Sequence, residues 1–110
     1  MNNLLFTLAD PLAKEIYKFT FLLSQKYQFS IGEQLRRSSL SVVLNIVEGY
    51  ARKSDKEKKH FYHISFGSLK ETQYLLKFIE DLELISLEKI NKNIQPSFYM
   101  VNRSKLGHYM

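Results

Sequence analysis

Apolar residues recur at helical spacing in four stretches of this chain, and helix-start signals precede them. Asp10 is a good N-cap residue and is followed by Pro11, which suits the first helical position. Ser54 and Glu57 have the spacing of a capping box, and Ser30 opens a similar run. Apolar residues every three or four positions give a helix one face for a core. These patterns predict helices over residues 10–27, 30–52 and 54–85, and a fourth helical segment from residue 86.

Composition favours an all-α fold. Hydrophobic residues make up 45% of the chain, and 4 Gly and 2 Pro are too few for the many tight turns of a sandwich or barrel. The length of 110 residues fits a single domain over residues 1–110. Helices joined by short connections predict an antiparallel up-down-up-down four-helix bundle. Pro96 interrupts the last segment, so we expect the last helix to be kinked or broken near it.

Several classes of protein are disfavoured. The chain has no Cys, which excludes a disulfide framework and a thiolate metal site. No apolar stretch reaches the length of about 18 residues that a membrane span needs. The first residues lack the basic region of a signal peptide. We therefore expect a cytoplasmic protein that does not engage a membrane.

Positive charge is concentrated in the middle of the chain. The net charge is +5, and residues 32–77 hold nine Lys and Arg against five acidic residues. A tight turn at Lys53 and Ser54 would place most of these cations at one end of the bundle. Such a surplus is typical of surfaces that meet nucleic acid or an acidic partner, although a solvated helix surface carries similar charge. The candidate nucleic-acid-binding residues are Arg36, Arg52, Lys53, Lys56, Lys58 and Lys59.

Four polar residues inside the predicted helices form a second group with a structural role. They are Arg37, Asn45, Glu48 and Glu71. An arginine here suits phosphate, or an ion pair with one of the glutamates or with a neighbouring subunit. A catalytic role would need a base beside the group, and His60 and His63 lie far from Glu71 along the 54–85 helix. We expect an Arg–Glu–Asn network inside the bundle or across subunits.

Small residues in the same two helices predict unusually close packing between them. They are Ser38, Ser39 and Ser41 on one helix, and Ser65, Gly67 and Ser68 on the other. Aromatic residues at helical spacing in this region can stack on bases, but a place in the core or in a subunit interface is the commoner role. These aromatic residues are Tyr50, Phe61, Tyr62 and Phe66.

One pattern invites a metal-binding interpretation. Glu57 and His60 form a Glu-x-x-His pair, and His63 follows one turn later. Di-iron bundles use two such pairs together with Glu from two further helices, and this chain has only one pair. We therefore expect no metal and no cofactor.

Three runs in these helices resemble a known family. They are Gln34 to Ser39 (QLRRSS), Asn45 to Ser54 (NIVEGYARKS) and Gly67 to Glu71 (GSLKE). They resemble Q-(I/L)-R-(R/K)-(A/S), N-I-(A/V)-E-G and G-S-L-x-E, which occur in this order in the four-helix-bundle proteins encoded in intervening sequences of bacterial large-subunit ribosomal RNA genes. The resemblance covers almost the whole chain. Pro96 departs from it, because the family's last segment is usually helical there.

The resemblance implies a left-handed four-helix bundle that assembles as a homopentamer. Similar accessory proteins of diversity-generating retroelements use a basic pentameric barrel to engage nucleic acid and a reverse transcriptase. By analogy we expect a non-enzymatic homo-oligomer that associates with RNA or DNA through a basic surface. The alternative is a protein-interaction adaptor for a larger enzyme such as a reverse transcriptase. An enzymatic function is disfavoured, because the sequence has no phosphate loop, nucleophile elbow or metal constellation.

Overall fold

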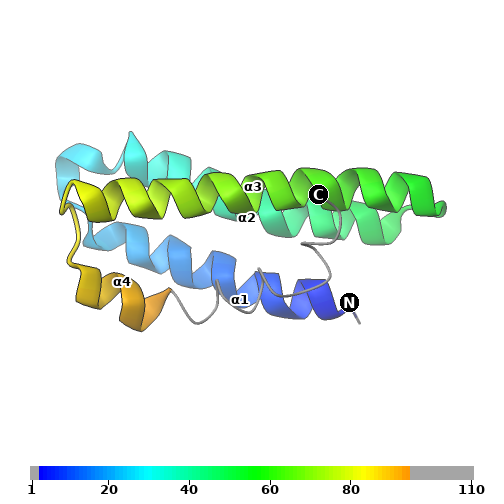
Figure 1. Ribbon diagram of the computed structural model, residues 1–110, viewed down its shortest axis with the longest axis horizontal. Helices are drawn as coiled ribbons and strands as arrows, with labels where there is room; N and C mark the ends of the chain where they lie inside the picture. The colour runs from blue at the N-terminus through cyan, green and yellow to red at the C-terminus, as the bar shows by residue number, and fades with distance from the viewer. Residues whose placement is uncertain (1–2, 95–110) are drawn as a thin grey trace.

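The computed structural model describes residues 3–94, which form four α-helices and two short 3₁₀ turns without any strand. The helices are α1 (Leu4–Phe19), α2 (Ile31–Ala51), α3 (Asp55–Asp81) and α4 (Leu87–Asn93), and the turns η1 (Thr20–Leu22) and η2 (Gln25–Tyr27) connect α1 to α2. Figure 1 shows the long helices α2 and α3 running side by side, with α1 and the short α4 along one side of the pair. The predicted all-α helical bundle is confirmed.

Helix α1 begins at Leu4, six residues before Asp10. The prediction that this helix starts at Asp10 is therefore wrong. Its cap is Asn3, whose side-chain oxygen accepts a hydrogen bond from the Phe6 N–H at 3.1 Å. Pro11 consequently lies inside the helix. Pro11 is exposed, and so is Thr7, whose carbonyl loses its intrahelical donor to the proline; exposure to water limits the cost.

The predicted continuation of this helix to Tyr27 is also wrong. Helix α1 ends at Phe19, and the chain tightens into η1 and then η2 before α2 begins. Thr20 is fully buried at this point, and its hydroxyl donates to the Tyr17 carbonyl at 2.7 Å. A hydroxyl that bonds a carbonyl one turn back competes with the helical pattern and bends the chain.

Serine side chains cap two of the later helices. Ser54 accepts a hydrogen bond from the Glu57 N–H at 3.1 Å, and Ser86 accepts one from the Lys89 N–H at 3.3 Å. Ser30 makes no such bond to α2; its hydroxyl instead donates to a carbonyl of the preceding turn at 3.4 Å. The capping box predicted at Ser30 is therefore wrong, although α2 starts there and ends at Ala51 as predicted.

Hydroxyl groups join α2 to α3. Ser65 donates to the Val42 carbonyl (2.7 Å), Ser41 bonds Ser68 (2.8 Å) and Thr72 donates to Ser38 (2.8 Å). Near the turn, a Cβ built on Gly49 would lie 2.6 Å from the Tyr62 ring, so only glycine admits this ring without a shift. The predicted contact between the helices is confirmed for Ser38, Ser41, Ser65 and Ser68, whereas the Ser39 hydroxyl bonds a carbonyl of its own helix. Gly67 does not take part, because it is exposed and a Cβ there would meet nothing within 4 Å.

The core lies between this hairpin and α1, and α4 closes one end of it. Its fully buried apolar side chains come from every helix and include Leu12, Ile16, Leu35, Ile46, Leu69, Ile79 and Ile90. Helix α3 ends at Asp81, four residues before the predicted end, and Glu83 then adopts a left-handed conformation (φ 55°) as the chain turns into α4. Helix α4 ends at Asn93, and Pro96, with the rest of the predicted last segment, lies outside the described residues.

Candidate nucleic-acid interface

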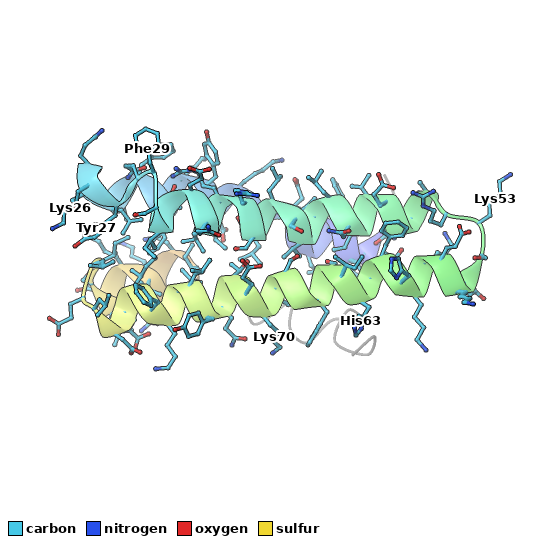
Figure 2. All side chains as sticks on the ribbon, turned by 90° about the horizontal axis from the view of Figure 1, so that it is seen from above. Lys26, Tyr27, Phe29, Lys53, His63 and Lys70 are labelled. Carbon is cyan, nitrogen blue, oxygen red and sulfur yellow. The ribbon has the colours of Figure 1, made fainter. Side chains whose placement is uncertain are left out.

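The turn between α2 and α3 carries most of the predicted nucleic-acid-binding residues. Helix α2 ends at Ala51 and α3 begins at Asp55, so Arg52, Lys53 and Ser54 form the tight turn that was predicted. Figure 2 shows Lys53 at one tip of the hairpin, with Lys26 and Phe29 at the opposite end. We call residues 48–59 the basic turn. It holds five Lys and Arg against three acidic residues, a surplus of two positive charges.

Two of these cations are engaged by the fold. Arg52 pairs with the Glu48 carboxylate at 2.8 Å and lies 4.8 Å from the centre of the Phe61 ring. The Lys58 ammonium donates to the carbonyls of Tyr50 (3.0 Å) and Gly49 (3.4 Å) at the carboxyl end of α2. A cation at this end satisfies carbonyls that lack helical partners and stabilises the helix dipole. Lys58 therefore helps to hold the turn in shape.

Three lysines of the basic turn project into solvent. They are Lys53, Lys56 and Lys59, all of them exposed, and none has a hydrogen bond or ion pair with another residue of the described part of the chain. Flexible ammonium groups of this kind suit phosphate as mobile point charges, whereas base readout needs fixed forks. The arrangement can attract a nucleic-acid backbone but contains no rigid element that would select a sequence.

Arg36 does not belong to this cluster. It lies sixteen residues before Arg52 on α2, about 24 Å away along the helix. Its guanidinium donates to the Thr20 hydroxyl (2.8 Å), the Gln28 carbonyl (2.7 Å) and the Gln28 side-chain oxygen (3.3 Å), and it lies 5.6 Å from the centre of the Phe21 ring. Arg36 thus ties η1 to α2. No local pattern in the sequence signals this role, because Thr20 and Gln28 are not helical neighbours of Arg36.

The four residues predicted to form a polar network are not joined to one another within one chain. Glu48 pairs with Arg52, and the Asn45 amide donates to the Ser41 carbonyl (2.8 Å) and hydroxyl (3.1 Å). Arg37 and Glu71 are exposed and have no ion pair within residues 3–94. Contacts across subunits stay a prediction. The buried polar groups that do interact are the serines and Thr72 between α2 and α3, and no buried side-chain polar atom in the described residues lacks a partner.

The outer face of α2 is apolar where a helix on the surface of a monomer would be polar. Leu40 (52% exposed) and Leu44 (53% exposed) lie on it together with Val47 and Tyr50. Leu40, Val43, Val47 and Tyr50 recur at helical spacing in the sequence, which predicts a second apolar stripe on this helix. Of these, only Val43 is buried in the single chain. Leu44 was missed, although its spacing from Leu40 and Val47 places it on the same face.

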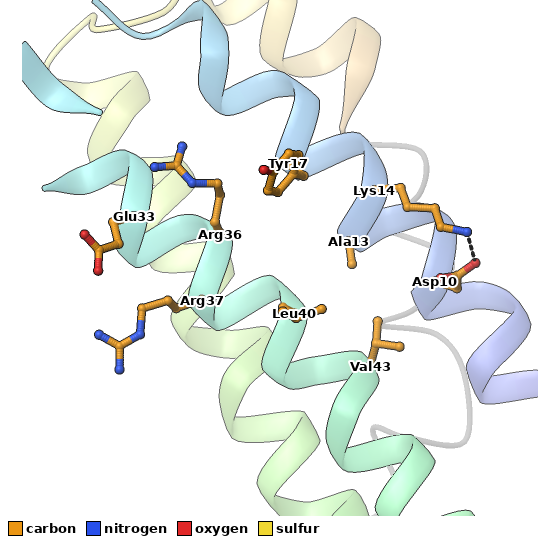
Figure 3. A pocket seen from close by; sticks show the side chains of 9 residues that line it. All are labelled: Asp10, Ala13, Lys14, Tyr17, Glu33, Arg36, Arg37, Leu40 and Val43. Carbon is orange, nitrogen blue, oxygen red and sulfur yellow. Dashed lines mark hydrogen bonds and ion pairs between the residues drawn. The ribbon is translucent and has the colours of Figure 1, made fainter. Parts of the chain in front are cut away.

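A groove of about 350 Å³ lies between α1 and α2 beside this stripe (Figure 3). Its floor is apolar, with Ala13 of α1 facing Leu40 and Val43 of α2, while Glu33, Arg36 and Arg37 lie at one end. Asp10 on the opposite wall is neutralised by Lys14 at 2.8 Å. The groove extends the apolar surface of α2 toward α1.

The aromatic residues divide between core and surface. Tyr62 and Phe66 are buried, which confirms a core position for these two, whereas Tyr50 is exposed. Of the predicted metal-pattern residues, His60 packs edge-on against Phe61 (ring centres 5.2 Å apart). Within residues 3–94 no cluster of three or more His, Cys, Asp or Glu side chains is placed to hold a metal ion. Nor is any helix of this part of the chain both long and apolar enough to cross a membrane.

Comparison with protein families gives a match over most of the chain. The sequence model of the family described as 23S rRNA-intervening sequence protein matches residues 2–100, so the chain belongs to this family. The match includes all three runs on which the resemblance rested. No curated protein matches the chain.

Proposed function

Starting from membership in the 23S rRNA-intervening sequence protein family, we propose that this chain is a non-enzymatic bundle protein that forms a homopentameric ring and associates with nucleic acid. One geometric observation carries the proposal. The basic turn lies at one tip of a hairpin whose outer α2 face is apolar along the helix. Side-by-side assembly through that face would gather every basic turn on a single rim.

The apolar face supports self-association. Leu40, Leu44 and Val47 leave large apolar side chains in water in the single chain. Removal of apolar surface from water contributes about 25 cal/mol per Å², and contiguous exposed apolar patches mark interaction sites. A second copy is a partner that is always present at the concentration of the protein itself.

Assembly would also strengthen the electrostatic attraction. A net charge of +5 per chain becomes about +25 in a pentamer. Within one chain the basic turn has a surplus of only two charges, too few for strong binding of phosphate. Five copies on one rim would give a positive ring that binds RNA or DNA without sequence preference. Its affinity would fall steeply with rising salt, because binding releases counterions from the nucleic acid and a high salt concentration makes that release less favourable.

Light scattering at low and high salt, with and without a 30-nucleotide RNA, tests this proposal. We expect a pentamer at both salt concentrations and an RNA complex only at low salt. A variant with Lys53, Lys56 and Lys59 changed to Gln should lose RNA binding and keep its mass. The matched control changes Lys14, Lys18 and Lys26, three exposed lysines outside the basic turn, to Gln. A monomer, or RNA binding that ignores salt, would contradict the proposal.

A different surface favours an adaptor as the second candidate function. Phe29 (80% exposed) lies at the end of the bundle opposite the basic turn (Figure 2), and the exposed Phe21 and Tyr17 line the same surface hollow. Exposed aromatic side chains are typical anchors of protein interfaces. The adaptor would bind a larger enzyme, with a purified reverse transcriptase as the probe. Changing Phe21 and Phe29 to Ser should abolish co-elution with the probe and leave RNA binding unchanged; co-elution that survives would contradict this candidate.

A further inference from the structure

We propose that the outer face of α2 in one copy packs against the outer face of α3 in the next copy, in the same register that the two helices have within one chain. This inference rests on the self-association proposed above and names the surface of the second copy that covers the α2 stripe. It also names the ion pairs that would set the register.

The outer face of α3 has a feature that a single chain does not explain. Gly67 lies in the middle of this 27-residue helix, exposed, with open space around the position of a Cβ. Glycine inside an exposed helix is unfavourable relative to alanine, so its presence calls for a close neighbour. Figure 2 shows His63 and Lys70 on the side of α3 that faces away from α2. Gly67 lies between them in the sequence, within one turn of each.

Closure of a ring fixes the register between neighbouring copies. A head-to-tail contact closes only when the repeated operation is a pure rotation, because any shift along the axis produces an open filament. The α2 stripe runs along the helix, so the rotation axis must run along the bundle. Equivalent residues of all copies then lie at the same height, and α2 of one copy meets α3 of the next at the heights already seen in the hairpin.

The hairpin contacts supply these heights. Thr72 bonds Ser38, and each residue back along α2 corresponds to one residue forward along α3 because the helices are antiparallel. Five steps from this contact, Glu33 lies level with Lys77. Arg37 lies within two residues of the height of Glu71, about 3 Å along the axis.

A third pair lies nearer the turn. The contact between Gly49 and the Tyr62 ring places Glu48 level with His63. Two acids and one base of α2 thus meet two bases and one acid of α3 at matching heights. Glu48 and Lys77 now make exposed pairs with Arg52 and Asp81 on their own helices. Exposed pairs of this kind are weak and can be exchanged or shared at an interface.

Gly67 fits the same register. The Ser41–Ser68 contact places Gly67 level with Val42, which lies between Leu40 and Leu44 of the stripe. Two leucines one turn apart leave room between them on a helix surface, and the facing helix can approach closely only where it lacks a side chain. The glycine would therefore be the point of closest approach between copies.

A charge-reversal cycle tests the register. Arg37→Glu and Glu71→Arg should each raise the dissociation constant of the oligomer at least about tenfold, because each places like charges together. The double variant, which restores an opposite-charge pair, should return to within about threefold of the original. Lys26→Glu reverses the charge at an exposed position of η2, between α1 and α2. It is the matched control and should leave the dissociation constant of the oligomer unchanged. Circular dichroism confirms that each variant remains helical.

Two further variants separate the outcomes. Gly67→Leu should leave the monomer folded, because a single chain has space there, and should prevent assembly. Rescue of Arg37→Glu by Glu48→Arg on the same helix, in place of Glu71→Arg, would show two α2 helices packed about a two-fold axis and would overturn this inference. An oligomer indifferent to all these changes would overturn it while leaving self-association standing. A monomeric original protein would instead overturn the proposed function.

Discussion

The two faces of α2 differ in the size of their side chains, in the opposite sense to that of most surface helices. The face toward α3 carries Ser38, Ser41 and Gly49, which let the helices approach and bond through hydroxyls. The outer face carries Leu40 and Leu44, which a single chain leaves half in water. The inner face thus accounts for the contact of α2 with α3, and the outer face is the surface that we propose a second copy covers.

The largest effect should come from comparing two leucines of this helix. Leu35 is fully buried and Leu44 is 53% exposed. Leu35→Ala should lower the free energy of unfolding by about 2–5 kcal/mol, since it leaves a cavity. Leu44→Ala should change it by less than about 0.5 kcal/mol when measured at concentrations below assembly. Urea unfolding of both variants makes the comparison, and equal losses would show that the outer face is buried in the monomer.

Adjacent arginines offer the next comparison. Arg36 makes three hydrogen bonds to the α1–α2 connection, whereas Arg37 makes none within residues 3–94. Arg36→Met should lower the free energy of unfolding by about 2–3 kcal/mol, because it removes charge-assisted bonds and leaves their partners unpaired. Arg37→Met should be nearly neutral for the monomer. Thermal unfolding distinguishes the two variants. Equal midpoints would contradict the conclusion that Arg36 stabilises the chain by holding the α1–α2 connection against α2.

The two glycines should respond with opposite signs. Gly49→Ala should destabilise the monomer by about 1–2 kcal/mol, because the new methyl group overlaps the Tyr62 ring. Gly67→Ala should stabilise it by about 0.5–1 kcal/mol, because alanine restricts the unfolded chain and fits the open site. Denaturant titration of both variants measures the difference. A loss of stability in both would mean that Gly67 has a neighbour within its own chain.

The smallest effect sharpens the picture of the inner face. Ser65→Ala removes the hydroxyl that donates to the Val42 carbonyl at 2.7 Å and should lower the free energy of unfolding by about 1 kcal/mol. Gln73→Ala on the exposed side of α3 is the control, with an expected change within about 0.5 kcal/mol. Amide hydrogen exchange along both helices would locate the loss. A neutral Ser65 variant would show that the hydrogen bond to the Val42 carbonyl does not stabilise the hairpin.

Predictions from sequence succeeded where the cause was local. The helix after Ser54 begins as predicted because its hydroxyl bonds an N–H three residues away. The same reasoning failed at Asp10, since Asn3 supplied an earlier cap and helix formation continued through an exposed proline. It failed again near Thr20, where the end of α1 depends on a buried hydroxyl and on Arg36, sixteen residues away.

The candidate site divides in the same way. The basic turn followed from the short connection between two recognisable helices. The separate roles of its residues could not be predicted from the sequence. Whether Lys58 caps α2 or projects into solvent depends on how the turn places it against the carbonyls of Gly49 and Tyr50. The prediction that Arg36 belongs with the basic turn failed for a comparable reason. Its hydrogen-bond partners lie in the α1–α2 connection, whose sequence has no periodic pattern.

The sequence by itself determined that this protein is helical, where most of its helices lie, that α2 has two apolar stripes, and to which family it belongs. These properties depend on residues within a few positions of one another along the chain, where spacing alone decides what shares a face. Only the tertiary structure decided which stripe of α2 is buried, which glycine lies against an aromatic ring and which arginine bonds the connection between α1 and α2. Each of those depends on contacts between segments far apart in the chain, and such contacts exist only once the helices have packed.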